Sequence, residues 1–319
     1  MKKSYSGYIY IILCALIFSV VEVVLKAVAG IFHPLQITYL RFLMGGAVLF
    51  PFARRSMRAH GARFGKAEFR FFALLGFLFV CIAMTVYQMA VTYTKASVVA
   101  VLFSCNPIFV TVLAHLILRE PIRKNHIIAL CLEVLAVMII IDPLHTSLSP
   151  LGCALALASA VLFALYGVIG KRQTPRVGGI AVTCLCSLFG GAEMLLLLLL
   201  GRTGIGGAIY RALGLTLFID VPLLSGISLS TLPWLLYIGA VNTGFGFVCH
   251  MLAMEKTSAQ TASLIFFLKP MLAPVFAFLL LHEEITANMR LGIVCFLIGS
   301  AIAILPGLLA ERRTNVTAG

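Results

Sequence analysis

The stretch TSAQTASLIFFLKPMLAPVFAFLLLHEEITAN, residues 257–288, decides the fold because a second copy, TKASVVAVLFSCNPIFVTVLAHLILREPIRKN, occupies residues 94–125. One constant offset aligns Asn106-Pro107 of the first copy with Lys269-Pro270 of the second. Each copy is a long apolar run with this polar residue and proline near its middle. Because proline removes a helical hydrogen bond and bends the axis, we expect helix breaks at both dipeptides, with a gating role for Pro107 and Pro270.

The repeat extends over the whole chain. A second offset places Gly7 on Gly152 and Leu43 on Leu188. The second half is longer than the first, and its extra residues fall in the connection 201–231. The sequence therefore predicts two related halves, residues 1–145 and residues 146–319.

Composition places the chain in a membrane. Of its 319 residues, 61% are hydrophobic and only 11% are charged, whereas soluble domains carry roughly a quarter charged residues. The nine cysteines lie in apolar runs without CxxC spacing. We interpret them as small buried side chains, and we expect neither a metal site nor a cofactor.

Ten apolar segments approach the length that a helix needs to cross a bilayer. They are residues 8–27, 35–52, 69–91, 98–118, 127–141, 151–169, 180–200, 232–254, 261–281 and 291–309. Helices are required because unpaired backbone groups cannot face lipid. The sequence thus predicts an all-α integral membrane protein with ten transmembrane helices, arranged as two five-helix repeats.

An odd number of spans in each repeat has a topological consequence. Five helices return the chain to the opposite side of the membrane, so the second repeat is inserted upside down. Inverted repeats of this kind are typical of secondary transporters, which bind substrate near the bilayer midplane between the two halves. The connection 201–231 contains a shorter apolar piece, 212–224, which we interpret as interfacial or re-entrant and not as an eleventh span.

Basic residues predict the orientation of the spans. With both termini in the cytoplasm, the cytoplasmic connections hold 17 of the 24 basic residues, namely Lys2, Lys3, Arg54, Arg55, Arg58, Arg63, Lys66, Arg70, Arg119, Arg123, Lys124, Lys171, Arg172, Arg176, Lys256, Arg312 and Arg313. Such a bias orients multispanning proteins. It also accounts for the formal charge of +13 without a nucleic-acid partner. We interpret the Arg-rich segment 53–70 as a loop that sets topology, in preference to a site for anionic lipid.

These features together resemble the drug/metabolite transporter superfamily, in particular its EamA-type members with ten spans. The resemblance rests on the duplicated five-span pattern, on Arg41-Phe42 in the second span, and on a mid-span proline followed by a glutamate in each half, Pro107 with Glu120 and Pro270 with Glu283. It implies a carrier of small organic solutes, often an exporter, with a cavity between the third, fourth, eighth and ninth spans. It names no substrate. Lys269 departs from the pattern, which does not demand a charge there.

Ionisable residues inside spans are costly and usually face protein or water. Glu22 and Arg41 lie at similar depth in the first two spans, so they are expected either to form a structural ion pair or to gate or contact substrate. Lys269 lies near the middle of the ninth span, where it is expected either to bind an anionic group of the substrate or to pair with Glu133 or Glu193.

Four further polar residues complete the sequence predictions. Asn106 and Asn242 join Lys269, Glu22 and Arg41 as candidates for substrate binding. His250 is expected to be a hydrogen-bonded packing residue, and Glu120 is expected to cap the helix that follows it.

The functional prediction is a secondary transporter that exports a small organic metabolite, such as an amino acid, across the cytoplasmic membrane by alternating access. No enzyme is expected, since the chain lacks clustered catalytic residues and a phosphate-binding GxxxxGK[ST] loop. Its partners would be the small-molecule substrate, membrane lipid and a coupled ion or counter-solute. The oligomeric state stays open, and a monomer is compatible with the sequence. The alternative is a membrane accessory protein or enzyme acting on lipid-linked intermediates.

Overall fold

The computed structural model describes residues 5–28, 30–94, 96–122, 124–142, 149–281, 287–288, 290–299 and 301–302. In the first half the helices are α1 (Tyr5–Ala27), α2 (Pro34–Ala59), α3 (Lys66–Gly76), η1 (Phe77–Met84), α4 (Thr85–Tyr93), α5 (Ala96–Phe103), α6 (Asn106–Leu118) and α7 (Lys124–Ile141). In the second half they are α8 (Pro150–Val177), α9 (Gly179–Gly201), α10 (Gly204–Ala212), η2 (Thr216–Phe218), α11 (Leu232–Leu236), η3 (Tyr237–Gly246), α12 (Phe247–Lys256), α13 (Ala259–Ala262) and α14 (Ile265–Leu281). Within these residues the fold is all-α, as predicted, and contains no β-strand.

Six helical stretches are long and apolar enough to cross a membrane. They are Pro34–Ala59, Lys66–Val91, Val98–Leu118, Pro150–Val177, Gly179–Gly201 and Leu232–Lys256. Shorter apolar helices cover Ser6–Val21, Ile127–Ile140 and Arg290–Gly299. Large apolar side chains on these helices face outward, among them Leu74 at 72% exposure and Leu116 at 68%. An outer surface of this kind suits lipid, so the chain is a helical multi-pass membrane protein.

The connection 201–231 carries only short helices. α10 has nine residues, too few to cross a hydrocarbon core. Its Tyr210 hydroxyl donates to the carbonyl of Leu197, 3.0 Å away, which ties α10 back to the end of α9. The prediction that this connection does not contain a spanning helix is confirmed.

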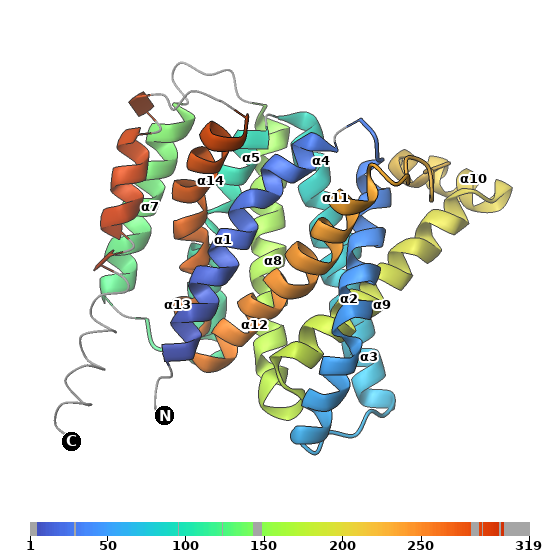
Figure 1. Ribbon diagram of the computed structural model, residues 1–319, viewed down its shortest axis with the longest axis horizontal. Helices are drawn as coiled ribbons and strands as arrows, with labels where there is room; N and C mark the ends of the chain where they lie inside the picture. The colour runs from blue at the N-terminus through green and yellow to red at the C-terminus, as the bar shows by residue number, and fades with distance from the viewer. Residues whose placement is uncertain are drawn as a thin grey trace.

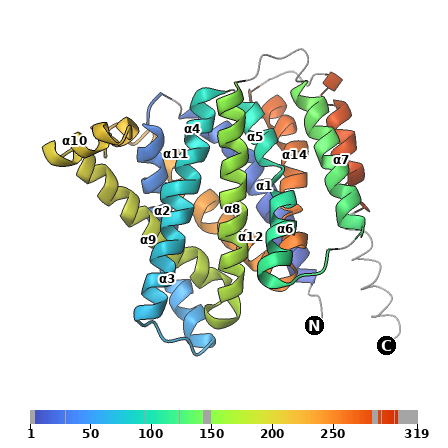
Figure 2. The same ribbon diagram turned by 180° about the vertical axis from the view of Figure 1, so that it is seen from behind.

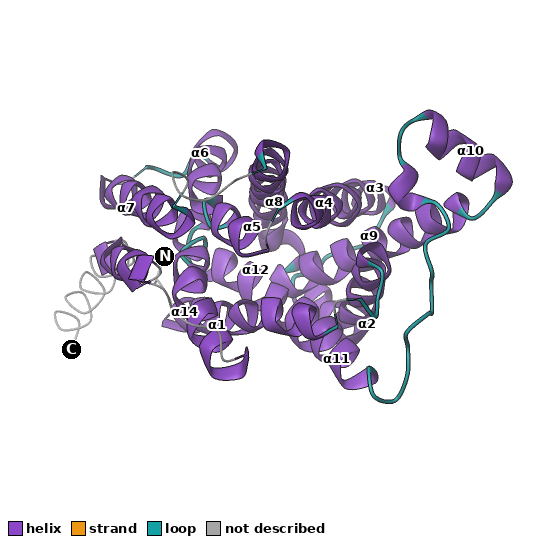
Figure 3. Cartoon of the chain, turned by 90° about the horizontal axis from the view of Figure 1, so that it is seen from above, coloured by secondary structure: helices purple, strands orange, loops and turns teal. Residues whose placement is uncertain are grey.

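The helices form two layers, seen from above in Figure 3. One layer contains α3, α4, α5, α6, α7 and α8, and the other contains α1, α11, α12, α14 and the helical residues 290–299. The opposite views in Figures 1 and 2 show one layer each: α1, α12 and α14 lie toward the viewer in the first, and α3, α4 and α8 in the second. α2 and α9 pack on each other at one side of the molecule.

The first helix of each half lies in the layer of the other half. α1 packs against α12 and α14 of the second half, while α8 packs against α4, α5 and α6 of the first. The two halves are therefore interlocked, and the surfaces of α1 and α8 form much of the contact between them.

Contacts between α2 and α9 are reciprocal. A Cβ added to Gly46 would lie 2.6 Å from Leu188 Cγ, and a Cβ added to Gly191 would lie 3.0 Å from Leu43 Cγ. The repeat equates Leu43 with Leu188 and Gly46 with Gly191, so each contact is the counterpart of the other. The pairing also runs in opposite directions along the two helices, since the earlier residue of α2 meets the later residue of α9.

The same reciprocity recurs at the two ends of the molecule. A Cβ on Gly7 would lie 2.5 Å from Thr257 Cγ2, and a Cβ on Gly152 would lie 2.7 Å from Thr94 Cβ. Gly7 corresponds to Gly152 and Thr94 to Thr257 in the repeat. Small residues thus bring helices of different halves close together in equivalent ways.

The predicted helix breaks are found in both copies, but not at matching positions. α5 ends before Ser104-Cys105 and α6 begins at Asn106, with Pro107 in its first turn. In the second copy the break falls at Ser263-Leu264, between α13 and α14. Pro270 lies inside α14, so the break expected at Lys269-Pro270 occurs six residues earlier. Backbone bonds of three-residue spacing, such as Phe266 N–H to Ser263 O, close this turn.

Candidate functional site

The third and eighth spans are locally π-helical at equivalent positions. η1 covers Phe77–Met84, and η3 covers Tyr237–Gly246, which the repeat offset largely superposes. π-helical segments are rare and frequently mark functional sites. The sequence analysis did not find them, although Gly239, Gly244 and Gly246 around Asn242 were a possible signal in a membrane helix.

Aromatic rings from both halves meet in the middle of the molecule. Phe79 of η1 stacks on Tyr166 of α8 with ring centroids 3.8 Å apart, and it also contacts Phe247 of α12 at 5.3 Å. We call the group the central aromatic cluster; its members are Phe18, Phe42, Phe79, Phe103, Phe163, Tyr166, Phe247, His250 and Phe266. These rings fill the space between the layers.

The predicted binding residues near this cluster are closed off from solvent. Asn106 is 0% exposed, Asn242 is 2% exposed and Lys269 is 6% exposed. The Asn106 side-chain amide donates to the carbonyl of Ala160 on α8, 2.8 Å away, and so joins the halves. The conformation is therefore closed in the middle, with polar groups held inside.

Several of these buried polar atoms have no hydrogen-bond partner within the described part of the chain. They are Asn106 Oδ1, Asn242 Oδ1, the Tyr166 hydroxyl and both ring nitrogens of His250. His250 packs between Phe163 and Phe266 as expected, but without the hydrogen bonds expected of it. Each unsatisfied group costs about 1–3 kcal/mol, and a site built to receive a polar ligand leaves such groups to be satisfied by that ligand.

Lys269 lies on α14, which packs on α1. It acts electrostatically on the thiol of Cys14, which itself donates to the carbonyl of Gly246, 3.3 Å away. Phe267, two residues earlier on α14, belongs to the same buried cluster as Ala136 and Val137 of α7. Two residues correspond to about 200° around a helix, so Lys269 and α7 lie on different sides of α14.

The two candidate carboxylate partners lie elsewhere. Glu133 on α7 is 1% exposed and lies in the same apolar cluster face as Cys105, and neither of its carboxylate oxygens has a hydrogen-bond partner among the described residues. Glu193 on α9 is half-buried beside Cys81 of η1. The Lys269–Glu133 ion pair, one of the alternatives left open by the sequence, is not formed.

Arg41 lies at the junction of α2 and η1. Its guanidinium carbon lies 4.9 Å from the centroid of the Phe42 ring, and its Nη2 lies 3.3 Å from the sulfur of Met84. Arg41 is 6% exposed and its Nε has no partner among the described residues. The side chain of Glu22, its expected partner, lies outside the described residues. Arg41 thus brings a buried cation to the edge of the central aromatic cluster.

Glu120, which follows the end of α6, joins the halves near α13, at the lower end of Figure 1. Its Oε1 accepts from Lys171 Nζ on α8 at 2.5 Å and from the backbone N–H of Ala259 at 3.2 Å. Ala259 is the first residue of α13, so Glu120 caps a helix of the other half. The sequence had predicted that it caps the helix that follows it, and this prediction is wrong. We call this three-residue contact the Glu120 latch. Its repeat counterpart, Glu283, lies outside the described residues.

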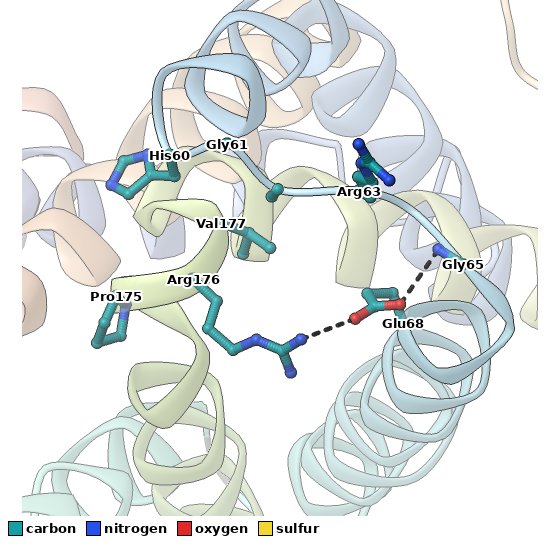
Figure 4. Close-up of a pocket in the computed structure, with 9 residues that line it drawn as sticks. His60, Gly61, Arg63, Gly65, Glu68, Pro175, Arg176 and Val177 are labelled. Carbon is teal, nitrogen blue, oxygen red and sulfur yellow. Dashed lines mark hydrogen bonds and ion pairs between the residues drawn. The ribbon is translucent and has the colours of Figure 1, made fainter.

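A hollow of about 600 Å³ lies at the same end, between the α2–α3 loop and the end of α8 (Figure 4). Arg176 Nη2 binds Glu68 Oε1 across it at 3.1 Å. Most of the lining is exposed and polar, and includes His60 and Arg63. This surface fits the topology-setting loop predicted from the sequence better than it fits a transport site.

With this geometry established, comparison with known proteins decides the family. The chain matches the EamA-like transporter family over residues 5–142 and again over residues 150–305. The chain belongs to this family. Membership of the EamA-like family identifies the protein as a transporter, in agreement with the resemblance seen in its sequence.

Relatives of this EamA-like protein support the assignment. A protein of Clostridium kluyveri described as an uncharacterized transporter is 36% identical over 95% of this chain and 93% of its own length. PagO of Salmonella typhimurium is 24% identical over 74% of this chain and 72% of its own. A solved crystal structure superposes with a TM-score of 0.71 over 97% of this chain and 98% of that chain, at 16% identity. That likeness concerns the fold alone.

Proposed function

We propose that this EamA-like protein is a secondary transporter that exports a small organic metabolite, such as an amino acid, across the cytoplasmic membrane by alternating access. The observation that carries the proposal is the reciprocity of the contacts between the halves. Two related halves that meet through equivalent residues can exchange which end is closed and which is open.

Ten spans in two inverted repeats are part of the proposal. The opposite directions of α2 and α9 at the Gly46–Leu188 and Gly191–Leu43 contacts support an inverted relation. With this arrangement both termini lie in the cytoplasm, because most basic residues then fall on that side. The lower end of Figure 1, with the Glu120 latch, is the cytoplasmic end.

The proposed substrate site is the central aromatic cluster and the buried polar groups around it. Lys269 and Arg41 supply positive charge for a carboxylate, while Asn106 and Asn242 supply amide groups. The aromatic rings offer an apolar surface for the rest of a small metabolite. Export would be driven by a coupled ion or a counter-solute, since no nucleotide-binding motif is present in the sequence.

Cysteine labelling tests this function. In a cysteine-depleted background, cysteines are introduced at Ile108 beside Pro107 and at Met271 beside Pro270. We expect each to react with small water-soluble reagents from either side of the membrane, depending on conditions, because each follows one of the two prolines proposed to gate the path. Val112→Cys, at an outward-facing position of α6 that is 50% exposed, should react with lipid-soluble reagents under all conditions. Reaction of the Ile108 and Met271 positions only from the lipid phase would contradict transport and favour the accessory protein or lipid-modifying enzyme.

Breaking the Glu120 latch should favour opening of the cytoplasmic end. Glu120→Gln removes a charge-assisted contact between partly buried groups, each 16% exposed, so we expect a loss of about 1 kcal/mol. Labelling of the Ile108→Cys reporter from the cytoplasmic side should then rise about fivefold. Glu68→Gln, which breaks the more exposed pair with Arg176 at the same end, is the matched control and should leave labelling unchanged. Equal effects of both changes would show that the latch has no special role.

A further inference from the structure

Glu133 is buried in an apolar environment, and the described residues offer it no charged partner. It lies on the face of α7 that carries Ala129, Ala136 and Val137. These residues form one apolar cluster with Val98 of α5, Cys105 between α5 and α6, Leu264 just before α14, Phe267 of α14 and Phe296. The titratable groups that pack on this cluster are Cys105, Cys153 and Cys295. Of the nearby cations, Lys269 lies on the far side of α14 and Arg290 is exposed. No described basic side chain therefore neutralises Glu133.

An ionised carboxylate in this position would be costly. Removing a charge from water without a partner costs several kcal/mol, and membrane carboxylates of this kind commonly belong to ion or proton paths. A neutral carboxylic acid is much cheaper, although it still leaves its polar atoms without hydrogen bonds. Structural packing alone would be served better by leucine or methionine. The side chain is thus expected to carry a proton when it is enclosed.

A small void with three polar side chains in its walls lies one helical turn from Glu133. It has a volume of about 10 Å³, close to the space that one water molecule needs. Thr111, Gln260 and Ser263 give it polar walls, and the Gln260 side-chain nitrogen has no hydrogen-bond partner among the described residues. Leu130 also lines it and sits three residues before Glu133, on the same face of α7. A water molecule here would bond polar side chains of both halves, Thr111 of the first and Gln260 and Ser263 of the second. It would lie one helical turn from the Glu133 carboxyl group.

Glu133 is also next to a helix break. Cys105, on which it acts electrostatically, is one of the two residues that separate α5 from α6. Pro107, in the first turn of α6, lines the same small void. Movement at this break would change the access of water to Glu133, and ionisation of Glu133 would in turn favour the hydrated arrangement. The two events are therefore linked.

We propose that Glu133 is a proton-binding site that couples substrate movement to the proton gradient. The carboxylate takes one proton from water in the open arrangement, holds it as a carboxylic acid while the site is enclosed, and returns it to water on the other side. No other bond is made or broken. This inference rests on the proposed transport function, and it assigns the coupled ion of that function.

The test uses the full chain with the Ile108→Cys reporter in a cysteine-depleted background, in liposomes of phosphatidylcholine and phosphatidylglycerol. An impermeant maleimide is added outside at constant outer pH, so that thiol reactivity does not vary, and only the inner pH is changed. Labelling should respond to the inner pH, by up to about tenfold per pH unit for one proton. Glu133→Gln, which cannot ionise, should abolish this response, and Glu133→Asp should retain it.

Glu193→Gln is the matched control, since it removes another carboxyl group of the membrane region and should leave the response intact. A Glu133→Gln protein that keeps the full response, or a wild-type protein with none, overturns the proposal. Infrared spectroscopy of the purified protein gives a second measurement that does not depend on the reporter. A protonated carboxyl band should be present at neutral pH in the wild type and reduced in Glu133→Gln, and a wild type without such a band also overturns it.

These results separate the inference from the function on which it rests. If an amino-acid mixture changes labelling of the wild-type reporter while inner pH does not, the protein moves between states without a proton at Glu133, and only the coupling is wrong. If neither treatment changes labelling, alternating access itself is wrong. If the Glu133→Gln protein does not fold, Glu133→Met, which suits an apolar cluster, replaces it with the same expected loss of response.

Discussion

Replacing Lys269 with methionine is expected to abolish transport while the protein remains inserted and folded. Methionine keeps the length and the apolar stem of lysine but removes the charge that is held 6% exposed near the middle of the ninth span. Loss of a buried charged contact costs about 2–5 kcal/mol, so transport should fall at least about thirtyfold. The substrate for this assay is the metabolite that accumulates in cells lacking the protein.

Two companion variants define the role of the charge. Lys269→Arg keeps the charge with a different geometry and should retain part of the activity. Glu133→Gln should not restore transport to Lys269→Met, because Glu133 lies on the other side of α14 and is not the counter-ion of Lys269. Normal transport by Lys269→Met alone would exclude Lys269 from the substrate path.

The second large effect is expected at Gly190, where α9 touches the third span. A Cβ at this position would collide with the carbonyl oxygen of Gly76 and lie 2.6 Å from Val80 Cγ2. Backbone atoms cannot move aside as the end of a side chain can. Gly190→Ala is therefore expected to destabilise the protein by about 1–3 kcal/mol, measured as a lower Tm of the folded peak in fluorescence-detected size-exclusion chromatography.

Gly204→Ala is the control for this change, because a Cβ there has no heavy atom within 4 Å. Its Tm should stay the same or rise slightly, since alanine favours a helix more than glycine does. Gly45 corresponds to Gly190 in the repeat, and a Cβ there would lie 2.9 Å from Gly239 O. Gly45→Ala should accordingly lower the Tm as well. An unchanged Tm in both Gly190→Ala and Gly45→Ala would mean that these helices do not pack as closely as described.

The repeat was the most informative feature of the sequence. Gly7 was equated with Gly152, and Thr94 with Thr257, from the amino-acid sequence alone. The structure brings Gly7 to Thr257 and Gly152 to Thr94, so the two contacts are equivalent in the repeat. Helical segments were also predictable, because hydrophobic length and the need to satisfy backbone groups leave few alternatives in a bilayer.

Features that depend on neighbouring helices could not be predicted in this way. Pro270 has the same sequence context as Pro107, yet α14 runs through Pro270 without interruption. The break in this copy lies before α14, at Ser263-Leu264. A proline inside a helix removes one hydrogen bond and crowds the preceding turn, but it does not fix where the chain breaks: here the break lies six residues before Pro270. The helix predicted to be capped by Glu120 was wrong for a similar reason. Glu120 is close in sequence to the helix that follows it, which favoured that helix. In the fold, the groups that reach its carboxylate are Lys171 and the N-terminus of α13.

The placement of charged groups around α14 shows the same limit. Lys269 and Glu133 share a depth in the membrane, which made an ion pair reasonable, but depth does not specify the side of a helix. The contacts of Phe267 with α7 and the proximity of Lys269 to Cys14 separate the two groups. Angular position around a helix follows from packing partners, and these are not visible in a single sequence.

The π-helical segments give the third and eighth spans a way to rotate without unwinding. If the wide π-helical turn of η3 became α-helical, the extra residue of that turn would join the regular helix. The following helix, α12, would then rotate by about 100° and shift by about 1.5 Å along its axis. Its backbone would exchange one set of hydrogen bonds for another, so little bonding energy would be lost. Phe247 and His250 follow η3 directly, and such a screw motion would carry both rings out of register with Phe79 and Phe163, parting the two halves at their centre.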